Sequence, residues 1–274
     1  MVKKSPEAAP LRGQLVLVTR PAHQSQGQTD LITSLGGQVL SLPLLQIEPV
    51  CETDTADFQQ LKRCILDLDL YTGVIFVSAN AARQGAAWID AYWPQLPLGV
   101  DWIGIGRQTC DTLMTLGFEA WHQPGGFDSE ALLQANSLQQ IKDQRFLILR
   151  GDSGRELLYD TLSARGARVD CATVYYRRCP RYPQAIVQST IYDQPISAML
   201  VTSGDGLSNL MQITDQASDA QRKQLLETRL ILPSPRIARL AEQLGFTQIT
   251  IAQGPDDQSM VQALIPANKL EKPA

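Results

Sequence analysis

Short apolar runs alternate along the chain with segments in which apolar residues recur at helical spacing. The runs predict strands at 15–18, 39–42, 74–77, 102–105, 146–149, 199–201 and 230–232. Helical patterns cover 30–35 and 109–116, and Gly36 and Gly117 stand where helix C-caps are expected. The run at 74–77 is apolar throughout, as in a parallel strand that is covered on both faces. This alternation predicts α/β domains with parallel sheets and right-handed crossovers.

The first half of this pattern is repeated in the second half. Segment 16–20 corresponds to segment 146–150, and each is followed by a glycine, Gly36 or Gly166. Each glycine lies 16 positions after the arginine that ends its segment, Arg20 or Arg150. Further matches pair 74–80 with 198–204, 103–118 with 231–246, and 127–129 with 257–259. A duplication of this length predicts two similar domains, and 274 residues suffice for two domains of ordinary size. Two facing domains would form a cleft, which is a common place for a ligand.

Composition excludes several classes of protein. Hydrophobic residues make up 44% and charged residues 19%, as in an ordinary globular protein. No apolar run approaches the roughly 20 residues that cross a membrane, and the start of the chain lacks the apolar core of a signal peptide. These features predict a cytoplasmic protein with no membrane contact. A net charge of −4 argues against a nucleic-acid partner.

The sequence carries no recognisable cofactor or metal signature. The five cysteines are scattered without a CxxC spacing, and the two histidines stand in no ligand-like cluster. Gly104-Ile105-Gly106 begins like a dinucleotide-binding fingerprint, but Thr109 occupies the position of its third glycine. We therefore expect a mechanism without metal or cofactor.

The residues at the carboxyl ends of the predicted strands are small hydroxyl residues, glycines and arginines. In open parallel sheets, ligands bind beyond these ends, where helix N-termini and backbone N–H groups favour anions. Helix capping and solvated arginines would explain any one of these residues, but their recurrence at six strand ends favours an anion site. The candidate binding residues are Thr19, Arg20, Ser78, Asn80, Gly106, Thr109, Arg150, Thr202, Ser203 and Ser234.

Two adjacent tyrosines, Tyr175 and Tyr176, end a predicted strand in the second repeat. Neighbouring residues of a strand face opposite ways, so only one of them can point into a given cleft. A tyrosine packed at a domain edge with its hydroxyl in water is the alternative to a functional one.

Taken together, the order and spacing of the motifs resemble the uroporphyrinogen-III synthase family over residues 15–264. The resemblance is carried by Thr19-Arg20-Pro21, Ser78-Ala79-Asn80, Gly106-Arg107-Gln108-Thr109, Arg150-Gly151-Asp152 with Arg155, Thr173-Val174-Tyr175, Thr202-Ser203-Gly204-Asp205-Gly206-Leu207 and Ser234-Pro235-Arg236-Ile237-Ala238. The chain departs from the family pattern at Ala81, where glycine is frequent, and at Ile237, where some relatives carry a hydroxyl residue.

The resemblance implies a lyase reaction of porphyrin and heme biosynthesis. Its substrate is hydroxymethylbilane, a linear tetrapyrrole with eight carboxylates, which is closed to uroporphyrinogen III with loss of water and inversion of ring D through a spiro intermediate. The uncatalysed product is the uninverted isomer, so the family's task is to fold the chain productively. By similarity, Tyr175 is the candidate general acid for the departing hydroxyl. A monomer is implied, with a transient contact to hydroxymethylbilane synthase.

The resemblance also implies an interleaved fold, whereas the repeat alone suggests two sequential halves. Two flavodoxin-like, doubly wound parallel-sheet domains are expected, joined by a two-stranded linker. Domain 1 would comprise 1–46 and 178–266, domain 2 would comprise 51–172, the linker strands would lie at 46–51 and 172–177, and 267–274 would be a tail.

Two non-catalytic hypotheses remain beside the synthase. A two-domain sensor of a small anion would share the strand-end residues without needing Tyr175. A regulatory paralogue would bind tetrapyrroles without turnover. Separating the type I and type III isomers formed from hydroxymethylbilane distinguishes these alternatives.

Overall fold

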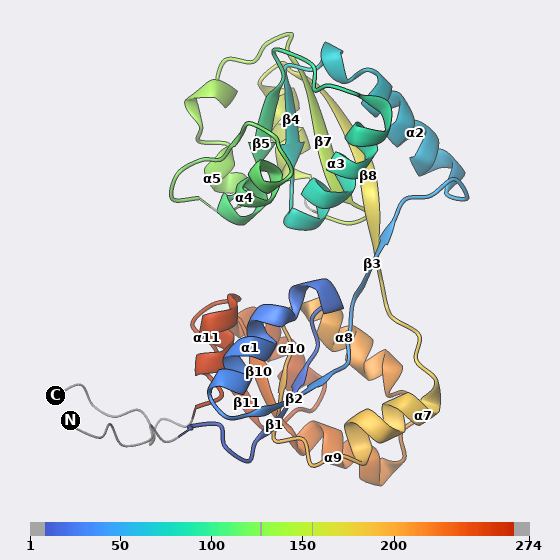
Figure 1. The fold of residues 1–274 in the computed structure, drawn as a ribbon, viewed down its shortest axis with the longest axis vertical. Coiled ribbons are helices and arrows are strands. Elements are labelled where there is room, and N and C mark those ends of the chain that lie inside the picture. The colour runs from blue at the N-terminus through green and yellow to red at the C-terminus, as the bar shows by residue number, and fades with distance from the viewer. Residues whose placement is uncertain (1–8, 127, 155, 266–274) are drawn as a thin grey trace, which may run out of the picture. The chain divides into compact units, whose positions relative to one another are not determined.

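The computed structural model describes residues 9–265 except 127 and 155, so Arg155 and the predicted tail lie outside the described residues. The chain forms two compact units (Figure 1). Unit 1 comprises Met1–Gln46 and Arg178–Ala274, and unit 2 comprises Ile47–Arg177. Both sections of unit 1 therefore contribute to one fold, although the whole of unit 2 separates them in the sequence.

Unit 1 contains a five-stranded parallel sheet in the order β2-β1-β9-β10-β11. Its strands are β1 (Leu15–Val18), β2 (Gln38–Ser41), β9 (Ala198–Leu200), β10 (Arg229–Leu232) and β11 (Ile249–Ile251). Val16 is paired with Val39 on one side and with Ala198 on the other, so N-terminal and C-terminal segments share the sheet. This order is that of a flavodoxin-like fold.

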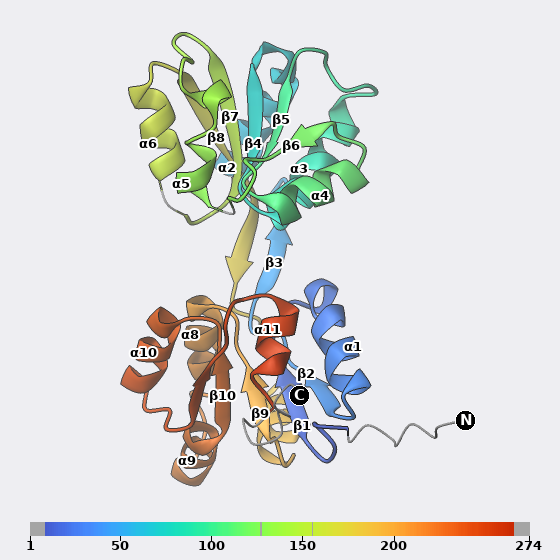
Figure 2. The same ribbon diagram turned by 90° about the vertical axis from the view of Figure 1, so that its left-hand side faces the viewer.

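Unit 2 contains a six-stranded sheet in the order β3-β8-β7-β4-β5-β6. Its strands are β3 (Gln46–Pro49), β4 (Gly73–Phe76), β5 (Asp101–Gly104), β6 (Ala120–Trp121), β7 (Arg145–Gly151) and β8 (Arg168–Arg178). The pairs from β8 to β6 are parallel. Strand β3 lies beside β8 and runs in the opposite direction (Figure 2). Apart from β3, the order repeats that of unit 1, with β7 and β8 in the places of β1 and β2.

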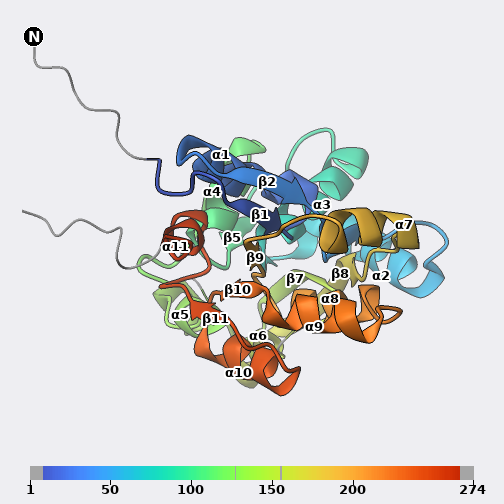
Figure 3. The ribbon, with the colours of Figure 1, turned by 90° about the horizontal axis from the view of Figure 1, so that it is seen from below.

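Helices cover both faces of each sheet. In unit 1, α1 (Gln26–Ser34) and α11 (Asp257–Gln262) lie on one side, and α8 (Gly204–Ile213), α9 (Asp219–Glu227) and α10 (Pro235–Gln243) lie on the other (Figure 3). In unit 2, α5 (Ser129–Leu132) and α6 (Leu157–Ala164) lie opposite α2 (Thr55–Leu66), α3 (Ala79–Tyr92) and α4 (Arg107–Thr115). The remaining short helices are α7 (Gln184–Val187), η1 (Ala22–Gln24), η2 (Leu68–Leu70), η3 (Asn136–Leu138) and η4 (Gln188–Tyr192). Within the described part of the chain, no helix has the length and apolar character that crossing a membrane requires.

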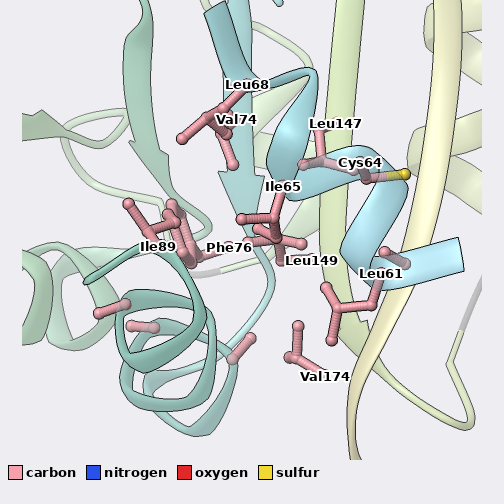
Figure 4. Packing of buried hydrophobic residues seen from close by; sticks show 14 of the residues in the cluster. Leu61, Cys64, Ile65, Leu68, Val74, Phe76, Ile89, Leu147, Leu149 and Val174 are labelled. Carbon is pink, nitrogen blue, oxygen red and sulfur yellow. The ribbon is translucent and has the colours of Figure 1, made fainter. Parts of the chain in front are cut away.

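The largest core of unit 2 lies between its sheet and helices α2 and α3. Leu61 and Ile65 of α2 pack with Phe76 of β4 and Leu149 of β7, and all four are fully buried (Figure 4). Gly104 belongs to this tight packing, because a Cβ atom there would lie 2.7 Å from the backbone nitrogen of Cys110 in α4. Close helix approach therefore accounts for this glycine, which the sequence placed in an incomplete nucleotide fingerprint.

The structure refines how the two repeats correspond. Gly36 and Gly117 adopt positive φ values of 83° and 89° after their helices, as helix C-caps do. At the tails, Asp128 caps α5 and Asp256 caps α11 through their carboxylates. The pairing of 127–129 with 257–259 was therefore wrong by two residues, and Ser129 corresponds to Asp257.

An ion-pair network ties the amino end of β7 to its neighbours. Arg145 donates to the Asp170 carboxylate through Nε at 3.0 Å and lies within 2.9 Å of it through Nη2. The Tyr71 hydroxyl donates to the same carboxylate at 2.8 Å, and the Arg145 guanidinium lies 4.4 Å from the centre of the Tyr71 ring. Burial, followed by hydrogen bonding to Cys64 and Asp170, raises the pKa of Tyr71 well above its ordinary value. The Tyr71 phenol therefore stays protonated, and the Asp170 carboxylate accepts hydrogen bonds from both Tyr71 and Arg145.

We predict that Asp170→Ala destabilises the protein, because it leaves Arg145 and Tyr71 without their shared acceptor. The Arg145–Asp170 pair is about one-third exposed, whereas Tyr71 is buried, so the expected loss is about 1–3 kcal/mol. Urea unfolding measures it. Asp160→Ala, at an exposed position of α6, is the control and should change stability by less than about 0.5 kcal/mol. Equal midpoints for the two variants would show that the network contributes nothing.

Candidate functional site

Most of the candidate residues lie where the strand order of each sheet reverses, and Gly106, Thr109 and Ser234 lie one strand further along, after β5 and β10. In unit 1 the reversal falls between β1 and β9, and in unit 2 between β7 and β4. Thr19 and Arg20 follow β1, and Thr202 and Ser203 follow β9, whereas Arg150 lies at the end of β7 and Ser78 two residues beyond β4. In doubly wound sheets this carboxyl edge is where ligands bind.

Four helices begin at this edge with their N-termini at strand ends. Ser78 caps α3 by accepting from the Ala81 N–H at 3.0 Å, and Ser203 caps α8 by accepting from the Gly206 N–H at 3.0 Å. Gly106 and Ser234 are the N-cap residues of α4 and α10, and neither makes a side-chain cap. Helix N-termini carry partial positive charge and unpaired N–H groups, so each strand end is suited to an anion.

In unit 1, two candidates are already bound into the fold. Thr19 is 4% exposed, and its hydroxyl donates to the Leu200 carbonyl at 2.6 Å. Arg20 forms an ion pair with Asp257 at 3.0 Å and donates to the Pro255 carbonyl. Arg20 thus ties the end of β1 to the start of α11.

In unit 2, the structure brings Ser78 and Tyr175 together. The hydroxyl oxygens of these residues are 3.1 Å apart, although the residues come from the segment after β4 and from β8. Tyr175 is 6% exposed and packs in the largest core of unit 2. Ser78 already accepts a hydrogen bond from Ala81, so its hydroxyl proton is available to Tyr175.

Gly151 makes room for the Tyr175 ring. A Cβ atom on Gly151 would lie 2.9 Å from two ring atoms of Tyr175 and 3.2 Å from its hydroxyl oxygen. A register shift between Arg150 and Gly151 places Gly151 opposite Tyr175. Gly151 belongs to one of the motifs in the sequence, but the hydrophobic pattern does not reveal the β-bulge that places it against the Tyr175 ring.

Tyr176 has a different partner. Its hydroxyl donates to the Asp57 carboxylate of α2 at 2.7 Å. The two neighbouring tyrosines therefore contact different elements: Tyr175 contacts Ser78 after β4, and Tyr176 contacts Asp57 of α2.

Three further candidates lie at helix starts in unit 2. Gly106 is buried at the start of α4, and Thr109 is 4% exposed in the first turn of that helix. Asn80 is half-buried in the first turn of α3. The edge of unit 2 therefore gathers Ser78, Asn80, Gly106, Thr109, Arg150 and Tyr175.

Arg150 is bound to an acid that the sequence did not single out. Its Nη2 donates to the Glu156 carboxylate at 2.8 Å, and Glu156 precedes α6 as its N-cap residue. This hydrogen bond raises the pKa of Arg150 and lowers the pKa of Glu156, so both groups are charged at neutral pH. Glu156 lies six residues after Arg150, beyond the end of β7, and this spacing matches no sequence motif that predicts the pair.

Two cavities meet at Arg150. The first, here called the α5–α6 cavity, has a volume of about 270 Å³. Its apolar lining comes from Val77, Ile105, Ile148 and Leu158, and its polar lining from Asp128, Ser129, Glu130, Arg150 and Tyr159. The second, here called the β8 cavity, has a volume of about 200 Å³ and is lined by Gln60, Arg150, Glu156, Tyr159, Cys171 and Thr173.

The thiol in the β8 cavity is chemically quiet. Burial raises the pKa of Cys171 to about 11, with Arg150 acting in the opposite direction. At neutral pH this thiol stays protonated and is a poor nucleophile. Across the described ranges, no group of three or more histidines, cysteines and acidic residues is arranged to hold a metal ion.

The fold defines a class: doubly wound α/β proteins of two units, in which ligands are expected at the carboxyl edges of parallel strands. Residues 28–262 match the family model described as "Uroporphyrinogen-III synthase HemD". The chain belongs to the uroporphyrinogen-III synthase family.

Similar proteins cover almost the same length. The uroporphyrinogen-III synthase of Salmonella typhimurium is 33% identical over 255 residues, covering 91% of this chain and 99% of that protein. The Escherichia coli enzyme is 32% identical over 250 residues, with the same coverage of each chain. The resemblance stated from the motifs is therefore confirmed.

Solved structures show the same fold at lower identity. The Helicobacter pylori uroporphyrinogen-III synthetase superposes with a TM-score of 0.59 at 12% identity, covering 91% of this chain and 97% of that one. A mutant Thermus thermophilus uroporphyrinogen III synthase gives 0.57 at 17% identity, covering 94% and 100%. The predicted fold class, two parallel-sheet α/β domains, is confirmed.

We predict that Gly151→Ala moves the Tyr175 ring and breaks its 3.1 Å contact with Ser78, because the added methyl would overlap the ring edge. The crowding should cost about 1–3 kcal/mol of stability. A crystal structure of the variant and its thermal midpoint test this expectation. Gly154→Ala is the control, since a Cβ there meets nothing within 4 Å. An unmoved Tyr175 ring in Gly151→Ala would contradict the positioning role.

Proposed function

We propose that this chain cyclises hydroxymethylbilane to uroporphyrinogen III with inversion of ring D and loss of water. Family membership over most of the chain supports the reaction. The observation that carries the chemistry is the Ser78–Tyr175 hydroxyl pair at the carboxyl edge of unit 2. This pair supplies a proton donor at the place where a ligand is expected.

The proposed binding residues match the charge of the substrate. Eight carboxylates are best received by many dispersed N–H donors and a few arginines, and the strand ends of both units offer these. The proposed set is Thr19, Arg20, Ser78, Asn80, Gly106, Thr109, Arg150, Thr202, Ser203 and Ser234. Thr19 is included for its position at the carboxyl end of β1, because its hydroxyl proton is already donated to the Leu200 carbonyl.

The first chemical step is loss of the terminal hydroxyl of the substrate. The Ala81 N–H donates to Ser78, and Ser78 can donate in turn to the Tyr175 oxygen, which leaves the phenolic proton of Tyr175 for the departing hydroxyl. The hydroxyl then leaves as water, while electron density from its pyrrole nitrogen forms the azafulvene. Positioned acid assistance of this kind contributes roughly 10²–10⁴-fold to rate.

The later steps depend mainly on conformation. The substituted carbon of ring D attacks the azafulvene carbon and forms a spiro intermediate. That intermediate breaks the original bond between ring D and its methylene bridge to ring C. The freed methylene carbon then bonds to the unsubstituted α-carbon of ring D, and the proton lost from that carbon restores the Tyr175 phenol. Because the uncatalysed route gives the uninverted isomer, holding the carboxylates in a fixed arrangement is what selects the type III product.

We further infer a monomer that works without a resident cofactor in the cytoplasm. The substrate closes spontaneously to the wrong isomer, so a short transfer from hydroxymethylbilane synthase would protect it. A transient contact with that enzyme follows as part of the proposal.

We predict that Tyr175→Phe lowers kcat by roughly 10- to 1000-fold with little change in KM, because the proton donor is lost while the binding residues remain. Tyr176→Phe should keep near-normal turnover and lose about 1 kcal/mol of stability through its missing bond to Asp57. The measurement is formation of the type III isomer by both variants. Equal activity would leave Tyr175 a structural residue, and a loss confined to Tyr176 would assign the acid to the wrong tyrosine.

We also predict that product binding weakens with salt, because charge-assisted contacts to carboxylates are screened. Affinity should fall several-fold between about 50 and 500 mM sodium chloride. A neutral solute at matched osmolarity serves as the control and should leave affinity unchanged. Salt-independent affinity would count against the roles of Arg20 and Arg150.

A further inference from the structure

Arg20 and Arg150 hold equivalent places in the two units but are paired with acids from different elements. Arg20 pairs with Asp257 in α11, whereas Arg150 pairs with Glu156 before α6. The unit 2 position that corresponds to Asp257 is Ser129, so Arg150 lacks that partner. In turn, Gln26 stands in unit 1 where Glu156 stands in unit 2, six residues after its arginine.

The two ion pairs differ in how firmly they are held. Asp257 is 30% exposed, and a Cβ on Gly27 would collide with its carboxylate, so the acid is enclosed beside α1. Arg20 also donates to the Pro255 carbonyl. Glu156 is 54% exposed and makes no side-chain cap of α6. Rotation of one exposed side chain would therefore release Arg150, whereas Arg20 would keep its hydrogen bond to the Pro255 carbonyl even if Asp257 rotated away.

The surroundings of Arg150 suit an incoming carboxylate. Besides Arg150 and Glu156, the β8 cavity is lined by the donor side chains of Gln60, Thr173 and Tyr159. Gln60 gives one amide proton to the Cys171 carbonyl at 2.5 Å and has a second to offer. The α5–α6 cavity is less suitable, because Asp128 and Glu130 contribute to its lining.

We propose that Arg150 in the β8 cavity is an exchangeable carboxylate-binding site and that Glu156 is its internal competitor, displaced when a ligand carboxylate binds. The ligand group is a carboxylate-bearing side chain of a pyrrole, an assignment that rests on the proposed function. Exposed ion pairs contribute little to stability, so the exchange is easily reversible. Glu156 would keep the site closed to weaker anions until a multivalent carboxylate ligand arrives.

The test uses Glu156→Gln in the full-length protein. Binding of uroporphyrin III, the stable oxidised form of the proposed product, is followed by fluorescence at low salt. We expect Kd to fall by about two- to fivefold, because the ligand no longer competes with an exposed carboxylate. The KM for hydroxymethylbilane should fall in the same ratio with kcat unchanged. Asp160→Asn, the matched control in α6, removes one exposed negative charge and should leave both constants unchanged.

A double variant separates competition from a general charge effect. In an Arg150→Gln background, Glu156→Gln should give no gain in affinity, since there is no arginine to release. Unchanged or weaker uroporphyrin III binding by Glu156→Gln alone would overturn the proposal, and so would an equal gain from Asp160→Asn. Failure of the wild-type protein to form the type III isomer would instead overturn the proposed function, while the binding comparison would still decide the exchange.

Discussion

Two strand pairings determine where the loops and helix N-termini of the structure gather. They are β4 with β7 in unit 2 and β1 with β9 in unit 1. In each pair, the connections that follow the two strands run to opposite faces of the sheet. The carboxyl ends of the two strands are therefore bordered by loops and helix N-termini. For this reason Arg150 and the Ser78 cap of α3 lie at the ends of adjacent strands, as do Arg20 and the Ser203 cap of α8. A single topological rule, used twice, places the candidate chemistry.

The two units have diverged in the use of this shared plan. In unit 1, the strand-end arginine is enclosed by Asp257 and holds β1 to α11. In unit 2, the same position pairs with an exposed acid and borders two cavities, and the tyrosine that contacts Ser78 is found there. The two units thus share one frame, and a few substitutions change what the strand-end arginine contacts in each of them.

Much of this arrangement could be predicted from the sequence, because apolar strands and glycine caps are local signals. The seven predicted strands match β1, β2, β4, β5, β7, β9 and β10 within one or two residues at each end. The short strands β6 and β11 are not predicted, because two or three residues without a buried side chain leave little periodicity. The strand-end residues were found because turn residues follow each apolar run directly.

The missing parts of the site are those that depend on long-range geometry. No local pattern shows that Gly151 faces Tyr175, because that contact results from a register shift between two strands. Nor does the sequence show that Arg20 pairs with Asp257, because the two residues are more than 200 positions apart in the chain. The neighbouring tyrosines illustrate the limit well: strand alternation separates them, but only the fold shows that one reaches Ser78 and the other reaches Asp57.

We propose that this arrangement directs the closure of a linear tetrapyrrole toward the inverted ring. The most direct measurement supplies the purified protein with freshly made hydroxymethylbilane and separates the type I and type III isomers. We expect the type III isomer to predominate with protein present and the type I isomer to predominate in its absence. Type I as the main product at every protein concentration would contradict the proposed function, even if the protein bound the tetrapyrrole tightly.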